Sequence, residues 1–584
     1  MSWIFGCLSE NLNEDDSRSF QFIHDDPIHV FKTTSLYLTV GGNQNTTFTS
    51  KDLNQINSDS KGYLVSGVGL ISDNQNQKIM CAKDWVKLLE TDSFDPSRIN
   101  GHFVVVIWND DKTIKIYNDL IGFRTIYIFT QENQIIFSTE LAWITKLVKN
   151  PTINLKAFGS RWTTFNQLSH ECLINGIEKL APGGKIEIGI NKIIRKNSNW
   201  IPPKVEATSE SFIEYLTPFL FPKSEYNSQI SLGLSGGLDS RILLALMLSK
   251  KNRNVRKNLI VHSFGDRDDP DLLVAAEICK KIGVEHTLLT KNISYDNNFI
   301  DRLSDYSKDA LLVEPLSSFI KNIYFDDEYF SNKIVIDGAN GEIARRQFYN
   351  RLFLKGKSDL KTRNTKNILN HLRISRSDIF NSSAMAEMEN GCLTDIENLF
   401  EVITPAEQIG VEKFIDMIAI KFRFPNYFGP EQSRLDKRIV SYMPFSQVSV
   451  LEHAFQLPAS LKRNSKFFYN LISESKPVLK KFPLVKNGIT YPYGLNSLSA
   501  FIYTRLKKRI NSSAVFDPTY LFYQRMKEYI NDLVASEEVR DFSLYNHNKI
   551  SKIVDHYYKG DKSVQSQLDW WLTFELWRQN LNLR

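Results

Sequence analysis

The stretch Ser231-Leu232-Gly233-Leu234-Ser235-Gly236-Gly237-Leu238-Asp239-Ser240-Arg241-Ile242 reads as an apolar strand, a turn of small residues and the start of a helix. Residues 242–248 are apolar almost without a break, which is typical of a buried helix. Glycine in the turn lets the backbone approach a ligand closely. The first amides of the helix have no partner within it, and the helix dipole adds positive potential there. The sequence therefore predicts an anion-binding turn that suits phosphate.

The side chains of this turn complete a predicted nucleotide site. Ser235 and Ser240 can add hydroxyl hydrogen bonds, whereas Asp239 would repel phosphate unless a cation lay between them, so we expect Asp239 to bind Mg²⁺. The turn is not a Walker loop, because no Gly-Lys-Ser/Thr follows it. The alternative is a glycine turn that only joins strand to helix. The residues predicted to bind ATP here are Leu234, Ser235, Gly236, Gly237, Asp239 and Ser240.

The composition limits the class of protein. A chain of 584 residues is expected to form two or more domains, and 42% hydrophobic with 24% charged residues is typical of a globular protein. A net charge of +6 is weak evidence for nucleic-acid binding, and we expect none. No apolar run approaches the ~18 residues of a membrane span. The five cysteines are far apart, so the sequence favours a reducing cytoplasm over a disulfide framework or a zinc site.

The first two hundred residues read as strands and turns. Alternating or continuous apolar segments of four to eight residues recur between turn signals, which predicts a β-rich layered domain. The predicted strands are Ser35–Val40, Gly62–Gly69, Phe103–Trp108, Thr113–Tyr117, Thr125–Phe129 and Gln134–Ser138.

From about residue 206, strands alternate with helices. The helix predicted over 269–283 begins with Asp and Pro and ends at Gly, and strands are predicted over 258–265 and 285–290. Repeated βα units imply a parallel sheet that binds ligands at the carboxyl ends of its strands. We therefore expect Ser263 and Phe264, which end a strand, to flank the adenine of ATP. The last segment, 497–584, is predicted to be helical.

Motifs along the whole chain resemble those of asparagine synthetase B and its relatives. Segments of the first part resemble class II glutamine amidotransferases, and the 235–240 turn resembles the pyrophosphate loop of ATP pyrophosphatases. The resemblance implies an α+β, layered, β-rich Ntn-like domain over 1–205. It also implies an α/β parallel-sheet ATP pyrophosphatase domain over 206–584 with a helical C-terminal part. The segments that carry the first resemblance are Met1–Gly6, Gly101–Phe103, Asn118–Tyr127, Phe137–Glu140 and Leu180–Gly184.

The N-terminal motifs depart from that family where its chemistry lies. In active glutaminases of this class, a cysteine after the initiator methionine attacks glutamine through its thiolate. This chain has Ser2 there, and Trp3 replaces a glycine where the substrate needs room. The His-Arg-Gly-Pro-Asp and Asn-Gly-Glu motifs of the family are missing. We therefore predict a glutaminase fold without glutaminase activity.

The segment Asp337-Gly338-Ala339-Asn340-Gly341-Glu342 is similar to the Ser-Gly-x-Gly-x-Asp-Glu motif of the family. The resemblance implies that Gly338 contacts ATP and that Glu342 binds Mg²⁺ with Asp239 and takes part in catalysis. The alternative is a turn with a helix-start charge. Ala339 stands where relatives have a tyrosine or a glutamate, so this motif supplies no general base. Arg345 and Arg346 follow, either to hold an acidic substrate group or to pair on the surface.

A lysine is expected near the α-phosphate. Lys462-Arg463-Asn464-Ser465-Lys466 is aligned with the Lys-x-x-Leu-Arg segment of the family, which implies that Lys466 is the catalytic lysine. A fixed cation stabilises the negative charge that forms when a carboxylate attacks the α-phosphate. Lys462, Arg463 and Lys480 are the rival candidates.

These features predict an ATP- and Mg²⁺-dependent ligase that adenylates a carboxylate and joins it to an amine. Two branches of the resembled family lack the glutaminase, the β-lactam synthetases and the lasso peptide macrolactam cyclases, and Ala339 with Glu342 favours the cyclase. A peptide substrate would bring two candidate partners, a protease and a precursor-peptide-binding protein. The alternatives are amidation of a sugar acid or another metabolite, and a nucleotide-binding homologue without activity. The sequence does not define the carboxylate, the amine, the general base or the oligomeric state.

Overall fold

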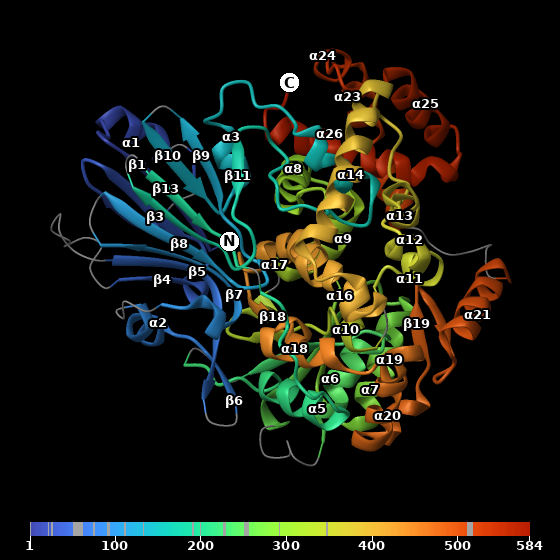
Figure 1. Cartoon of the computed structure of the whole chain (residues 1–584). Coiled ribbons are helices and arrows are strands. Elements are labelled where there is room, and N and C mark those ends of the chain that lie inside the picture. Colours follow the sequence, from blue (N-terminus) through green and yellow to red (C-terminus); the bar gives the residue numbers. More distant parts are fainter. Residues whose placement is uncertain are drawn as a thin grey trace.

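The computed structural model of the chain describes sixteen segments. They are residues 2–21, 23–24, 27–50, 62–73, 76–89, 94–109, 112–131, 133–189, 192–198, 200–225, 229–249, 256–290, 293–326, 328–345, 348–510 and 518–584. Arg346 and the basic residues Lys250, Lys251 and Arg253 lie outside them. Figure 1 shows a β-rich N-terminal part beside a larger α/β and helical part.

The N-terminal part contains two antiparallel sheets. The first has the order β11-β9-β10-β1-β3-β2, and the second has the order β13-β12-β8-β7-β5-β4, with β6 paired to β5. Their strands are β1 Trp3–Ser9, β2 Pro27–Lys32, β3 Leu36–Gly41, β4 Thr47–Thr49, β5 Gly62–Asp73, β6 Asn76–Ile79, β7 Asn100–Trp108, β8 Thr113–Asn118, β9 Tyr127–Gln131, β10 Gln134–Ser138, β11 Ile177–Lys179, β12 Lys185–Gly189 and β13 Lys192–Lys196. All six strands predicted in this region are confirmed, the one predicted from Thr125 beginning at Tyr127.

The two sheets pack face to face. Ile4 and Leu8 of β1 lie in one core with Val104 and Val106 of β7, because alternate residues of a strand point to the same side. The outer faces are covered by short helices, which the sequence did not predict in this region. These are α1 Glu14–Gln21, α2 Ala82–Leu89 and α3 Leu141–Thr145, whereas a fourth helix, α4 Leu155–Thr163, packs against the helical part of the chain. The predicted layered β-rich arrangement is thus confirmed, with helices on its outer surfaces.

The second part is organised around a five-stranded parallel sheet of order β16-β15-β14-β17-β18. Its strands are β14 Ile230–Gly233, β15 Leu259–Phe264, β16 His286–Leu289, β17 Ile334–Ile336 and β18 Val440–Tyr442. The parallel pairing aligns Leu232 of the central strand with Val261 and Ile336 of its neighbours. The parallel sheet predicted from the βα pattern is therefore confirmed. A separate antiparallel hairpin is formed by β19 Leu484–Lys486 and β20 Ile489–Tyr491.

Helices make up the rest of the second part. They are α5 Ser209–Leu216, α6 Asp239–Met247, α7 Pro270–Ile282, α8 Phe299–Ala310, α9 Phe319–Asn322, α10 Glu342–Arg345, α11 Asn350–Lys355, α12 Lys357–Lys361, α13 Thr365–Leu372, α14 Ser382–Val402, α15 Ala406–Ile409, α16 Val411–Ile418, α17 Gly429–Leu435, α18 Val448–Gln456, α19 Ala459–Lys462, α20 Lys466–Ser475, α21 Ser497–Ile510, α22 Pro518–Arg525, α23 Lys527–Ala535, α24 Glu537–Arg540, α25 His547–Tyr558 and α26 Gln565–Asn580. A π-helix, Ala419–Phe428, joins α16 to α17. No helix in the described segments is long and apolar enough to cross a bilayer.

One hydrophobic core contains residues from both sides of the predicted domain boundary at residue 205. Phe158 and Trp162 of α4 pack in the same core as Trp571 and Trp577 of the C-terminal helix α26. The helical nature predicted for the last segment is confirmed, and both of these tryptophans are buried. The domain boundary itself stays a prediction, because the first part of the chain contributes to the core of the second.

Helices α4 and α14 cross at very short range, and this contact gives a stability prediction. A Cβ on Gly391 would lie 2.3 Å from the carbonyl oxygen of Lys156, a distance that real Cβ atoms do not adopt. We expect Gly391→Ala to destabilise the fold by ~1–3 kcal/mol through overpacking, although alanine favours a helix over glycine. Thermal or urea unfolding measures the effect. Asn390→Ala, at the exposed neighbouring position, is the control and should leave the stability unchanged or raise it.

Candidate active site

A large cavity lies at the carboxyl ends of the parallel strands. Its volume is about 1360 Å³, and Gly233, Phe264, Asp337 and Met443, which end or follow four different strands, lie in its wall. This is the edge at which open α/β sheets bind ligands. The cavity exceeds the roughly 300–1,000 Å³ of pockets that hold a drug-sized ligand. It therefore has room for more than one small molecule.

The turn predicted to bind phosphate is part of this cavity, and its own side chains hold its shape. The hydroxyl of Ser240 accepts a hydrogen bond from the amide of Ser235 at 3.1 Å, and the hydroxyl of Ser235 accepts one from the amide of Gly237 at 3.1 Å. Arg241 donates to the carbonyl oxygens of Gly236 and Pro483 at 3.2 and 2.7 Å, so the turn is tied to the segment before β19. These contacts fix the turn before any ligand binds.

One amide of the turn already has an anionic partner. Asp271, in the first turn of α7, accepts a hydrogen bond from the amide of Gly236 at 2.8 Å. Burial raises the pKa of Asp271 above its usual range, against the opposing effect of this hydrogen bond. The sequence predicted free amides here, whereas the structure gives this one a carboxylate that a phosphate oxygen would have to displace. The turn thus holds a carboxylate of the chain itself, and its binding of phosphate stays a prediction.

Asp239 forms an ion pair that crosses the site. Both of its carboxylate oxygens accept hydrogen bonds from Arg345 of α10, Oδ2 from a terminal guanidinium nitrogen at 2.5 Å and Oδ1 from Nε. Burial works against the charge of Arg345, but the Asp239 carboxylate raises the pKa of the guanidinium above its usual value. A Cβ at Gly341 would lie 2.7 Å from Oδ1 of Asp239, so glycine is required there for the carboxylate to fit. A cation that bound Asp239 would therefore have to displace Arg345 from the carboxylate.

A second carboxylate, Asp337, which the sequence analysis did not single out as a metal ligand, lies within electrostatic range of Asp239. Asp337 follows β17 and lines the cavity, whereas Glu342 is half-exposed at the start of α10 and is absent from the lining. Burial, and then the charge of Asp239, raise the pKa of Asp337, so the two groups repel each other. Mg²⁺ is bound in proteins by one or two carboxylates together with substrate phosphates. The carboxylate oxygens of Asp239 and Asp337 in the cavity wall fit that ion.

The residues predicted to flank adenine lie in the cavity wall. Phe264 is half-buried and stacks on Tyr324, with ring centres 5.5 Å apart. The hydroxyl of Ser263 donates to the carbonyl oxygen of Leu234 at 2.6 Å, which joins β15 to the phosphate turn. Gly338 also lines the cavity. The structure therefore brings Leu234, Ser263, Phe264 and Gly338 together around one space.

The two candidate lysines differ in their surroundings. Lys462 ends α19, lines the cavity, and donates a hydrogen bond to Asp416 at 2.9 Å, with both side chains almost fully buried. Lys466 begins α20 on the exposed side and is not part of the cavity wall. Between them, Asn464 and Ser465 adopt left-handed backbone conformations, with φ of 56° and 58°. Two such residues in sequence store backbone strain, which is common at ligand sites.

Glu431 of α17 is a titratable group that the sequence analysis did not single out. It lines the cavity, and burial together with the charge of Glu314 raises its pKa well above that of an ordinary carboxyl group. A carboxyl group with such a pKa can exchange a proton near neutral pH. No local motif marks Glu431, because its environment comes from elements more than a hundred residues apart.

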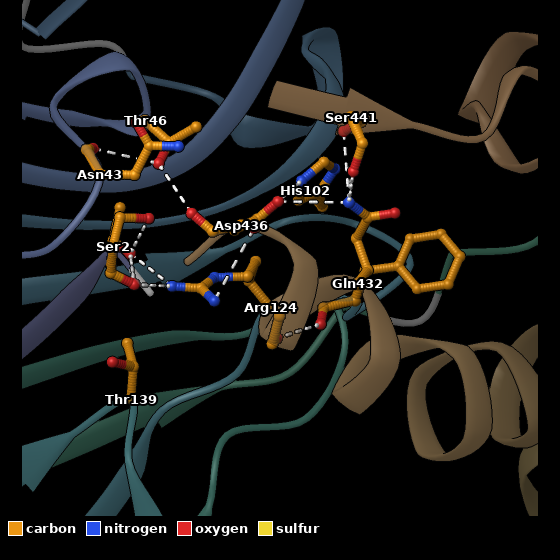
Figure 2. A network of polar contacts seen from close by, with 12 residues as sticks. Ser2, Asn43, Thr46, His102, Arg124, Thr139, Gln432, Asp436 and Ser441 are labelled. Atoms are coloured by element: carbon orange, nitrogen blue, oxygen red, sulfur yellow. Dashed lines mark hydrogen bonds and ion pairs between the residues drawn. The ribbon is translucent and has the colours of Figure 1, made fainter. Parts of the chain in front are cut away.

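Figure 2 shows a buried polar network between the N-terminal part and the cavity wall. Arg124 donates to the carbonyl oxygen of Ser2 at 2.6 Å and lies 3.8 Å from Asp436, which is also 2.9 Å from His102. Gln432, a residue of the cavity wall, donates to Asp436 at 3.2 Å. The position expected for the glutaminase nucleophile is thus a buried serine inside a polar network.

Trp3 closes the same region from the other side. Its ring stacks on His24 at 5.2 Å and meets Trp143 edge-on at 4.9 Å. The hydroxyl of Ser2 accepts a hydrogen bond from Ser66 at 3.0 Å. Aromatic rings and an internal hydrogen bond therefore fill the surroundings of Ser2 and Trp3.

A small-residue turn, paired charges and a large cavity lie together at the carboxyl edge of a parallel sheet, the place where open α/β sheets bind ligands. Residues 227–305, which include the turn, match the model of the asparagine synthase family. The predicted resemblance to the asparagine synthase family is therefore confirmed over this stretch of the chain.

Individual relatives are more distant. The microcin J25-processing protein McjC of Escherichia coli is 24% identical over 262 residues, which cover 43% of this chain and 47% of that protein. The match thus spans about half the length of this curated relative. A glutamine phosphoribosylpyrophosphate amidotransferase from B. subtilis, complexed with ADP and GMP, has a TM-score of 0.21 at 10% identity, covering 68% of this chain and 92% of that chain. A structure of the allosteric regulatory enzyme of purine biosynthesis has a TM-score of 0.21 at 11% identity, covering 68% of this chain and 86% of that one. Likenesses at these TM-scores are too low to inform the fold.

Proposed function

We propose that the chain is an AMP-forming amide ligase whose substrate is a peptide that it closes into a macrolactam. The observation that carries the proposal is the cavity itself: the 235–240 turn opens into it, and part of its wall belongs to residues 227–305, which match the asparagine synthase family. A carboxylate oxygen of the substrate attacks the α-phosphorus of ATP, and the bond to the bridging β-phosphate oxygen breaks. Pyrophosphate leaves, and the acyl group is carried by AMP.

The second step joins the acyl group to an amine. The amine nitrogen attacks the acyl carbon, loses a proton, and the bond to the phosphate oxygen of AMP breaks. Glu431 lines the cavity with a raised pKa, so we assign to it the acceptance of that proton. Lys466 is assigned to stabilise the negative charge that develops near the α-phosphate, as the family alignment implies.

The phosphates of ATP are assigned to the turn and the adenine to Phe264. The β- and γ-phosphates would bind Ser235, Gly237 and Ser240 once Asp271 has released the amide of Gly236. When bound, Mg²⁺ would neutralise part of the phosphate charge; Asp239 would hold it, with Glu342 or Asp337 as the second carboxylate. Arg345 would then leave Asp239 and pair with a phosphate instead.

Two observations support a peptide and its own amine as the substrate. Ser2 and the packed rings around Trp3 favour an N-terminal part that releases no ammonia from glutamine, so the amine would come from the substrate. The cavity is also larger than a nucleotide needs. The relative named for processing microcin J25 adds weight to the cyclase over the β-lactam or sugar-acid alternatives. The cysteine usage supports a cytoplasmic setting.

The products of ATP cleavage test this function. The protein is incubated with Mg²⁺, α-labelled ATP and a panel of linear peptides that have a free N-terminal amine and a glutamate or aspartate side chain. We expect AMP and pyrophosphate in equal amounts, and a peptide product lighter than the substrate by one water. The control peptides replace each acidic residue by its amide and should give no AMP. Formation of ADP, or rapid ammonia release from added glutamine, would contradict the proposal.

A further inference from the structure

Helix α21, Ser497–Ile510, exposes an apolar face at the rim of the cavity. Leu498, Ile502 and Leu506, spaced by four residues, are 68%, 50% and 54% exposed, and Phe501 is 43% exposed. Residues at this spacing form one stripe on a helix, which in a globular protein normally faces the core. In Figure 1, α21 stands at the right edge of the molecule, beside the hairpin strand β19. The stripe is therefore presented outward.

The opposite side of α21 is packed against the protein, so the apolar stripe does not face the protein's own core. Ala500 is buried, and Lys507 donates to the carbonyl and hydroxyl oxygens of Thr490 on β20 at 3.2 and 2.9 Å. Ala500, Thr504 and Lys507 lie on one side of the helix, opposite to the stripe. The orientation of α21 is thereby fixed.

The stripe continues into the cavity. Leu498 and Phe501 belong both to the exposed face and to the cavity wall. Another part of the rim is formed by α11, where Leu354 is 74% exposed and also lines the cavity. A ligand whose reacting end lay at Asp239 could therefore continue outward over an apolar surface without a break.

The part of the rim around α21 has one sign of charge, whereas Glu412 elsewhere in the cavity wall is paired with Lys357. Residues 475–516 contain eight lysines and arginines and no aspartate or glutamate. On α21 the guanidinium of Arg505 lies over the ring of Phe501 at 4.5 Å, and Lys508 is exposed. On α11, Arg351 and Lys355 are exposed beside Leu354. A complementary ligand is apolar and acidic.

We propose that α21, with the rim residues of α11, docks the part of a peptide substrate that stays outside the cavity, and that this segment is both apolar and acidic. The inference rests on the proposed function, because the docked segment belongs to the molecule whose carboxylate is adenylated. A second copy of this chain would bring a face of the same charge, which repels. An anionic bilayer fits the charge, but inserting Leu498 and Phe501 into lipid would close the cavity mouth.

Binding of a defined probe tests the proposal. The probe is a fluorescein-labelled 15-residue peptide of leucine and glutamate with leucines at helical spacing, and its counterpart has lysine for glutamate. The variants are Ile502→Ser/Leu506→Ser and Arg505→Glu/Lys508→Glu, whose residues lie outside the cavity wall. The control is Ile194→Ser/Ile201→Ser, which removes two isoleucines of matching exposure, 45% and 44%. Fluorescence anisotropy gives the Kd, and binding of a fluorescent ATP analogue shows that the cavity is intact.

We expect the glutamate probe to bind, the lysine probe to bind at least tenfold more weakly, and both α21 variants to raise the Kd of the glutamate probe at least tenfold. The control variant and ATP binding should not change. For a peptide that the wild type adenylates, the α21 variants should raise KM and leave kcat unchanged.

Three results would overturn the docking site. The first is equal binding of the glutamate probe by the wild type and the α21 variants. The second is binding of anionic phospholipid vesicles, but not of the probe, that the α21 variants abolish, and the third is a concentration-dependent dimer that the α21 variants dissociate. Failure of the wild type to form AMP would count against the ligase alone, since probe binding and its loss in the variants are measured without turnover.

Discussion

Replacing Asp239 by asparagine should lower the rate of pyrophosphate release by about 10²–10³-fold or more, the range seen when one electrostatic contact at a reacting phosphate or carbonyl is lost. The amide keeps the shape of the carboxylate and removes its charge. It therefore removes the proposed ligand for Mg²⁺ and the anionic partner of Arg345 at the same time. The rate is measured by pyrophosphate release with a peptide that the wild type adenylates, and Mg²⁺ dependence of ATP binding is measured by calorimetry without turnover.

Asp301→Asn is the matched control, because Asp301 is an exposed carboxylate of α8 outside the cavity wall. It should leave both readouts unchanged. A wild-type rate in Asp239→Asn at unchanged Mg²⁺ dependence would exclude the cavity as the place where ATP is cleaved.

The same calorimetry decides between the two candidates for the second carboxylate. Glu342 is implied by the resemblance to the family motif, whereas Asp337 lines the cavity and its pKa is raised by burial and by the charge of Asp239. If Asp337 binds the ion, Asp337→Asn raises the half-saturating Mg²⁺ concentration and Glu342→Gln does not. The reverse result would assign the ion to Glu342, and with it the arrangement implied by the aligned motif.

Local patterns were sufficient to predict the elements of the site. The helix expected over 269–283 forms as α7. At the start of the helix, Asp269 accepts a hydrogen bond from the amide of Asp271, and after its last residue Gly283 adopts a φ of 67°. The strand, turn and helix around residues 231–248 form for equally local reasons, since apolar runs and small residues act within a few positions. The parallel sheet followed from their repetition.

Partners far apart in sequence could not be predicted in the same way. Arg345 meets Asp239 across 106 residues, and the choice between Asp337 and Glu342 depends on how one turn is placed against α6. The packing of α4 against α14 is of the same kind, because α4, a helix that was not predicted in the β-rich part, joins the core of the helical part. Such contacts come from tertiary packing, and the sequence around each residue gives no signal of them.

We expect Lys466→Met to lower activity without lowering stability, and Lys462→Met to lower stability. The two variants together separate a catalytic role from a structural one. Lys466 is exposed and outside the cavity wall, so its replacement should leave thermal unfolding unchanged while lowering pyrophosphate release by about 10²-fold or more, provided that the lysine reaches the α-phosphate once ATP is bound. Lys462 is buried and paired with Asp416 at 2.9 Å. Its replacement leaves a buried carboxylate without its cation, which costs ~3–5 kcal/mol of stability.

The double variant Lys462→Met/Asp416→Leu isolates the second effect. Removing both charges of a buried pair in favour of apolar side chains is often neutral or stabilising, so thermal unfolding should return to near the wild-type temperature. If Lys462 only anchors α19 beside the strained turn at Asn464 and Ser465, pyrophosphate release should return as well. An inactive but stable double variant, together with an active Lys466→Met, would instead make Lys462 the lysine that acts on ATP, because it alone of the two lines the cavity.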